Sequence, residues 1–190
     1  MTRDWYWVRH GPTHAKGMVG WTDLPADLSE AAAIARIDRA LPREATCVSS
    51  DLNRAVATAD AVAPGRHRLP HVSALREMHF GDWEMRNFAE IEAEDPERIF
   101  AFWDQPGDNA PPNGESWNAL RARVDGWVDA YDRPGPVIAV AHFGVILTQV
   151  QKALGIPARE TFAQKIDNLS VTHLRQTGTD WALVTVNTRP

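Results

Sequence analysis

The run Pro-Val-Ile-Ala-Val-Ala at residues 136–141 restricts most strongly what this chain can fold into. The run is short and almost wholly apolar, which is typical of a strand that helices cover on both faces. Further runs have the length and composition of strands, at residues 4–9, 45–49, 170–175 and 181–186. A sheet with such a strand at its centre needs helices on both sides.

Helical patterns fill the intervals between these runs. We expect Ser29 and Ser50 to cap two of the helices, and Gly155 with Pro157 to end the last one. The expected helices span residues 29–41, 51–62, 86–104, 116–132 and 143–154. The alternation of strands and helices predicts an α/β fold, a three-layer α/β/α sandwich around a mixed, mostly parallel central sheet.

One domain is expected over residues 1–190, because 190 residues with 44% hydrophobic and 24% charged side chains suit a single globular core. Residues 104–114 are rich in proline, glycine and asparagine, yet they are too few to separate two domains. We therefore expect residues 84–115 to form a lid, first helical and then a loop, that covers the site and selects among substrates.

The charge balance argues against nucleic acid as a partner, because a net charge of -5 and a pI near 5.8 leave no obvious basic face. No run approaches the ~18 apolar residues that a membrane span needs, and no apolar signal core opens the sequence. The only cysteine, Cys47, fits a reducing compartment. These features predict a cytoplasmic protein with no membrane partner, and they make no prediction of its oligomeric state.

Polar side chains follow three of the expected strands. Arg9 and His10 follow the first strand. Residues 49–51, Ser-Ser-Asp, lead from the second strand to Arg54, and His142 follows the central strand. In an open α/β sheet, ligands bind at the carboxyl ends of the strands, where helix N-termini also point. The convergence of arginines, histidines and helix N-termini there predicts a site for a compact anion, and phosphate is the natural candidate.

A histidine in such a site has two interpretations. His10 could be one more donor to the phosphate, or it could attack phosphorus. Attack requires a neutral ring, and a hydrogen bond from one ring nitrogen to a backbone carbonyl near Gly11 would leave the other nitrogen free. A carboxyl group would then protonate the leaving oxygen and later activate water, and Glu77 is the candidate. Asp82 and Glu84 are the replacement candidates for that role.

Several motifs occur in order along the chain and together resemble the histidine phosphatase superfamily, also called phosphoglycerate mutase-like. The ordered set covers roughly residues 8–154 and is far more specific than the Arg-His-Gly triplet alone. The motifs are VRHGPT at residues 8–13, SSDLNRAVATA at 49–59, LREMHFGDWE at 75–84, NGESW at 113–117 and AHFGVI at 141–146. The third motif and the short chain are most similar to the alpha-ribazole phosphatase and broad phosphatase branch.

The resemblance implies a metal-independent phosphomonoester hydrolase that forms a phosphohistidine and acts, without a cofactor, on a small phosphorylated metabolite. It implies that His10 is the nucleophile and Glu77 the proton donor. Arg9, Arg54 and His142 would form the phosphate pocket. The expected substrate-binding set also includes Gly11, Thr13, Lys16, Gly20 and Phe143. A zinc-ligand motif such as H-E-x-x-H does not occur, and no metal is expected.

The chain departs from the family pattern at Pro12, Lys16 and Met85, where relatives often carry an acidic residue, an asparagine and a glycine. These positions belong to the expected rim of the pocket, so they bear on substrate more than on chemistry. Two alternatives are mutase-type phosphoryl transfer and a non-catalytic phosphate-binding regulator. The first is disfavoured because residues 85–100 are rich in acids, and the second because nucleophile and acid are both present.

Overall fold

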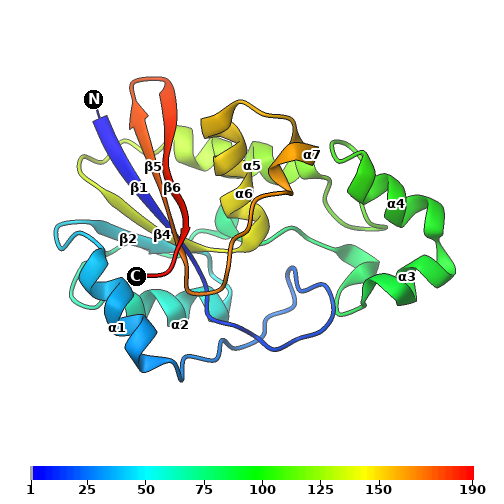
Figure 1. The fold of residues 1–190 in the computed structure, drawn as a ribbon, viewed down its shortest axis with the longest axis horizontal. Helices are drawn as coiled ribbons and strands as arrows, with labels where there is room; N and C mark the ends of the chain where they lie inside the picture. The colour runs from blue at the N-terminus through cyan, green and yellow to red at the C-terminus, as the bar shows by residue number, and fades with distance from the viewer. Residues whose placement is uncertain (1) are drawn as a thin grey trace.

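The structure, a computed structural model, describes residues 2–190 and within that range builds a six-stranded sheet (Figure 1). The strands are β1 (Thr2–Arg9), β2 (Thr46–Ser49), β3 (His67–Arg68), β4 (Val137–Ala141), β5 (Val171–Thr177) and β6 (Asp180–Thr188). Their order is β3-β2-β4-β1-β5-β6. The first four in this order are parallel, whereas β5 and β6 are antiparallel to their neighbours. The prediction of a mixed, mostly parallel sheet is confirmed.

Helices cover both faces of this sheet, so the three-layer prediction is also confirmed. The helices are α1 (Ala31–Ala40), α2 (Asn53–Val62), α3 (Phe88–Glu94), α4 (Pro96–Asp104), α5 (Trp117–Asp129), α6 (Phe143–Leu154) and α7 (Ala158–Thr161). α1 and α2 pack on one face, and α5 and α6 pack on the other. α3 and α4 extend beyond the sheet at the right of Figure 1. None of the helices in residues 2–190 has both the length and the apolar character needed to cross a membrane.

The central strand β4 is buried along its whole length, as its composition predicts. Because successive side chains of a strand point to opposite faces, β4 contributes to two hydrophobic cores. Val137, Ala139 and Ala141 pack with α5 and α6, whereas Ile138 and Val140 pack with α1 and α2. Burial on both faces explains why this run contains no polar residue.

One expected helix, over residues 86–104, is two helices in the structure. α3 ends at Glu94, and α4 begins at Pro96 after the N-cap residue Asp95. The Asp95 carboxylate accepts a hydrogen bond from the Arg98 amide, and proline at the first helical position has no N–H that needs a partner. Apolar residues are spaced as in a helix on each side of the break, Phe88 and Ile91 before it and Ile99 and Phe102 after it, so their spacing does not show that the helix is divided.

The predicted N-caps of α1 and α2 are wrong, whereas α6 ends at Gly155 as predicted. The N-cap positions of α1 and α2 are Glu30 and Leu52, so Ser29 and Ser50 each lie upstream of the cap. The Ser50 hydroxyl instead lies 2.7 Å from Nε2 of His142. The sequence also gave no signal for β3 and α7, which are too short to show a period.

The sheet register brings three strand ends to one edge. Arg9 of β1 pairs with Ala141 of β4, and Ser49 of β2 pairs with Val140 of β4. The residues that follow these pairs therefore lie side by side at the carboxyl edge of the sheet.

Candidate active site

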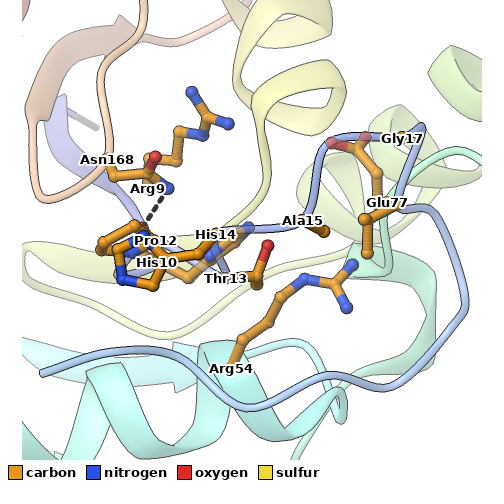
Figure 2. Close-up of a pocket in the computed structure, with 11 residues that line it drawn as sticks. Arg9, His10, Pro12, Thr13, His14, Ala15, Gly17, Arg54, Glu77 and Asn168 are labelled. Carbon is orange, nitrogen blue, oxygen red and sulfur yellow. Dashed lines mark hydrogen bonds between the residues drawn. The ribbon is translucent and has the colours of Figure 1, made fainter. Parts of the chain in front are cut away.

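A cavity of about 290 Å³ lies at this edge of the sheet (Figure 2). The end of β1 and the loop after it form most of the wall, and Figure 2 shows Arg54 rising from α2 toward the cavity. The lining residues are Arg9, His10, Pro12, Thr13, His14, Ala15, Gly17, Val19, Arg54, Glu77 and Asn168. The cavity thus brings together residues that are far apart in the sequence.

The ring of His10 has a fixed orientation. Its Nδ1 lies 2.6 Å from the carbonyl oxygen of Gly11, so Nδ1 carries the hydrogen and Nε2 keeps a free lone pair. A Cβ atom at residue 11 would lie 2.8 Å from the Asp27 carbonyl oxygen, which explains the need for glycine there. Burial and the Arg54 guanidinium lower the pKa of His10 to about 3, so the ring is neutral at physiological pH.

His142 lies beside His10, with 5.0 Å between the ring centroids. Its Nε2 is 2.7 Å from the Ser50 hydroxyl, whereas its buried Nδ1 has no hydrogen-bond partner within residues 2–190. Burial and the neighbouring His10 ring lower the pKa of His142 well below its ordinary value. If the Ser50 hydroxyl donates to Nε2, Nδ1 carries the hydrogen and can donate to a phosphate oxygen.

Two arginines, the partly buried Arg9 and the buried Arg54, supply the positive charge. Arg9 donates from Nη1 to the Ile166 carbonyl at 2.6 Å, and its guanidinium lies 5.3 Å from the Phe143 ring centroid. Arg54 donates to the carbonyl oxygens of Gly20 and Thr22, at 2.5 and 2.9 Å. The buried Nε atoms of both arginines are without a partner among the described residues 2–190, which leaves donors for an anion.

Glu77 is a buried carboxyl group in the wall of the cavity. It accepts a hydrogen bond from the Met78 amide at 2.9 Å, and the Gly144 amide at the start of α6 lies 3.1 Å from both of its oxygens. Burial raises the pKa of Glu77 more than these amides and the two arginines lower it. Burial therefore makes the protonated form of Glu77 more favourable than it is for an exposed glutamate.

Asp82 and Glu84, the replacement candidates for the proton donor, have hydrogen-bond partners different from those of Glu77. The exposed Asp82 carboxylate accepts hydrogen bonds from the Asn113 amide. Glu84 accepts from the backbone amides of residues 20–22, and these donors hold its pKa below the ordinary value although burial acts to raise it. Of the three acids, Glu77 lines the cavity.

The remaining predicted substrate-binding residues differ in their positions. Thr13 lines the cavity, and Gly11 lies beneath His10. Gly20 is buried behind Arg54, and Phe143 packs beneath Arg9. The side chain of Lys16 is exposed, and within residues 2–190 Lys16 is outside the cavity lining.

The sequence does not predict two polar side chains that contact the site, Asn168 and Arg123. Asn168 lines the cavity and donates from Nδ2 to the His10 carbonyl at 2.8 Å, the bond drawn in Figure 2. Arg123 donates to the carbonyls of Arg76 and Glu77, both at 2.8 Å. Asn168 lies outside the family motifs, so the sequence gives no reason to place it at the site. Arg123 lies on the amphipathic helix α5, where a cation is expected to face solvent.

A second, apolar pocket shares Glu77 with the cavity. Its other lining residues are Met78, Phe80, Phe102, Trp103, Trp117, Phe143, Gly144 and Phe162. Phe102 and Trp103 come from α4 and are the members of the expected lid, residues 84–115, that reach it. Residues 84–115 thus border the acid side of the site rather than the phosphate cavity itself.

Residues 5–189 match the family described as the histidine phosphatase superfamily (branch 1). An adenosylcobalamin/alpha-ribazole phosphatase of Salmonella typhimurium is 32% identical over 171 residues, which are 84% of each chain. A glucosyl-3-phosphoglycerate phosphatase of Mycolicibacterium vanbaalenii is 31% identical over 168 residues, 79% of this chain and 73% of the relative. The structure of a mycobacterial glucosyl-3-phosphoglycerate phosphatase with inorganic phosphate superposes with a TM-score of 0.77 at 30% identity, over 98% of this chain and 97% of that one.

Proposed function

The chain belongs to the histidine phosphatase superfamily (branch 1), and from that premise we propose that it hydrolyses phosphomonoesters through a phosphohistidine at His10, without a metal ion. One observation carries the proposal. The free Nε2 of a neutral His10 shares a cavity with two arginines and with a carboxyl group whose pKa is raised. This set contains a nucleophile, an anion-binding pocket and an acid.

In the first step, His10 Nε2 attacks phosphorus and forms a P–N bond while the ester P–O bond breaks. The Glu77 carboxyl group gives its proton to the leaving oxygen, so an alcohol departs and Glu77 becomes a carboxylate. Arg9, Arg54 and His142 hold the other phosphate oxygens and stabilise the charge that they carry in the transition state.

In the second step, the Glu77 carboxylate accepts a proton from water, and the water oxygen attacks phosphorus. The P–N bond breaks, inorganic phosphate leaves, and the enzyme returns to a neutral His10 and a protonated Glu77. The same carboxyl group can serve in both steps because its raised pKa lies closer to neutral pH than that of an exposed glutamate.

The substrate we propose is a small phosphate monoester. The volume of the cavity, about 290 Å³, suits a small ligand, and the relatives named above are phosphatases of small phosphorylated compounds. We further propose that residues 84–115 select the alcohol part of the substrate, because Phe102 and Trp103 line the apolar pocket beside Glu77, where the leaving group departs. Cys47 is free and buried, which fits action in a reducing cytoplasm.

Hydrolysis of an aryl phosphate in excess chelator tests the proposal. We expect the wild type to retain turnover in chelator and His10→Ala to lose it. His67→Ala, which removes an exposed imidazole on β3, should behave as wild type and serves as the matched control. Turnover that survives in His10→Ala, or that vanishes with chelator, would contradict the proposal.

A further inference from the structure

Glu84 is a half-buried carboxylate whose role the proposed mechanism leaves open. Its Oε2 accepts hydrogen bonds from the Gly20 amide at 3.0 Å, from the Thr22 hydroxyl at 2.8 Å and from the Thr22 amide at 3.3 Å. Its Oε1 accepts from the amides of Trp21 at 2.8 Å and Phe80 at 3.2 Å. Four backbone amides and one hydroxyl thus surround the two oxygens of Glu84, an arrangement that favours an ionised carboxylate.

The turn at residues 20–22 joins Glu84 to Arg54. Gly20 and Thr22 donate their amides to Glu84 and accept the Arg54 guanidinium on their carbonyls, at 2.5 and 2.9 Å. A Cβ atom at residue 20 would collide with the Met78 carbonyl oxygen and Glu84 Oε1, so glycine allows this close approach. The turn therefore fixes the buried guanidinium that faces the phosphate cavity.

The same turn also contacts the segment that carries the acid. The Trp21 indole donates from Nε1 to the Glu77 carbonyl at 2.8 Å. The Trp21 ring lies 4.9 Å from the Arg76 guanidinium and 4.6 Å from the His79 ring centroid, which packs it along that segment. A shift of residues 20–22 would move both the cation and the backbone of the proton donor.

We propose that Glu84 is a positioning residue. It holds the turn at residues 20–22, and this turn positions Arg54 and Glu77 around the phosphate. The proposal rests on the proposed function for its kinetic consequences. Its consequence for phosphate binding follows from the Arg54 contacts and does not depend on turnover.

Glu84→Gln is the most direct variant. An amide has the same shape, but its NH₂ group must face donors whichever way it is turned, so contacts to residues 20–22 are lost. We expect the Kd for inorganic phosphate, measured by calorimetry, to rise by about tenfold or more. We also expect kcat/KM for an aryl phosphate to fall by roughly 10²-fold, the effect of a small misplacement of catalytic groups.

Two further variants separate positioning from bulk stability. Glu84→Asp keeps the charge and should recover part of the phosphate affinity that Glu84→Gln loses. Glu97→Gln makes the same chemical change at an exposed site in the first turn of α4 and should leave phosphate affinity unchanged. If Glu84→Gln does not fold, Glu84→Asp and Thr22→Val, which removes one donor to Oε2, carry the test with smaller expected losses.

The outcomes are distinct. Unchanged phosphate affinity and kcat/KM in a folded Glu84→Gln, with only its melting temperature lowered, would overturn the proposal and leave Glu84 a structural residue. Wild-type protein that binds phosphate but hydrolyses no ester would contradict the proposed function, while the phosphate affinities of the variants would still decide the role of Glu84.

Discussion

At the scale of single residues, Glu77 and His10 have opposite protonation requirements. Burial raises the pKa of the carboxyl group, and burial together with Arg54 lowers that of the imidazole to about 3. The first chemical step needs protonated Glu77 and neutral His10, so activity is lost above the pKa of Glu77 and below that of His10. This order of the two pKa values leaves a pH window, from about 3 up to the raised pKa of Glu77, in which both groups are in the reactive form.

We predict that kcat/KM of the wild type falls as pH rises through the raised pKa of Glu77. Glu77→Gln should be much less active and should lack this alkaline limb, since an amide has no such proton to lose. A pH profile of both proteins with one aryl phosphate checks this, because the ionisation of the substrate is common to both. The same alkaline limb in both proteins would show that another group is responsible.

A second prediction concerns Ser50, whose hydroxyl lies beside Nε2 of His142. Ser50→Ala leaves this buried nitrogen without its partner, so we expect a loss of about 1–3 kcal/mol in the free energy of unfolding and roughly 10-fold or more in kcat/KM. Ser49→Ala is the matched control, because the Ser49 hydroxyl bonds to the Ser50 carbonyl and to Arg68 instead. Equal activity of the two variants would argue against a role for Ser50 in orienting His142.

The sequence indicates where the charged residues of the candidate site lie, but it does not indicate which residues hold them in place. His10, Arg54 and His142 follow strand ends or open helices, where α/β topology places ligands. Asn168 and Arg123 reach the site through contacts across the fold, with partners 158 and 46 residues away. Such tertiary contacts produce no local periodicity and cannot be read from spacing.

At the scale of elements, the start of the expected lid contains a strained residue. Met85 has φ of 64°, in the left-handed region that favours glycine. Its amide donates to the Met18 carbonyl, and the Met18 amide donates to the carbonyl of Arg86. The backbone at Met85 thus has the conformation that a glycine would adopt. Methionine at position 85 therefore adds backbone strain but does not change the course of the backbone.

We predict that Met85→Gly stabilises the protein by up to about 1 kcal/mol, because relief of left-handed strain outweighs the greater freedom of glycine in the unfolded chain. The Met85 side chain is 47% exposed, so little burial is lost. Met85→Ala keeps the Cβ atom and should show no such gain. Urea unfolding of the three proteins checks this, and a Met85→Gly variant no more stable than Met85→Ala would contradict it.

Element boundaries were predictable where a strong local signal exists. The end of α6 at Gly155, which has φ of 64°, and the start of this helix at Phe143 follow directly from sequence. The break at Asp95 and Pro96 carries a capping signal too, although the helix predicted over residues 86–104 runs across it. Two-residue β3 forms only because β2 is beside it.

At the scale of the whole molecule, the order of strands determines the site. Parallel β2, β4 and β1 lie next to one another, so their carboxyl ends bring residues near positions 10, 50 and 142 together. α3 and α4 stand apart from this sheet and contact the site through Phe102 and Trp103. Our proposal therefore places the chemistry and the choice of substrate in different parts of the fold.

This division predicts the result of a segment exchange. Replacing residues 84–115 by the corresponding segment of a relative should change relative kcat/KM among phosphate esters with different alcohols, while His10-dependent turnover of an aryl phosphate persists. A panel of apolar and polar esters measures this. Unchanged preference across the panel, in a folded and active exchange variant, would show that residues 84–115 do not select the leaving group.

The most direct test of the account is to trap the phosphoryl group on the protein. With an activated aryl phosphate, whose leaving group needs little protonation, Glu77→Gln should still be phosphorylated but should lose phosphate slowly, because the second step lacks its base. Alkaline quenching and peptide mass analysis should then find one phosphoryl group on His10, stable in alkali and lost in acid. A phosphoryl group on another residue, or turnover by the wild type with no phosphoprotein in either protein, would contradict the central role of His10.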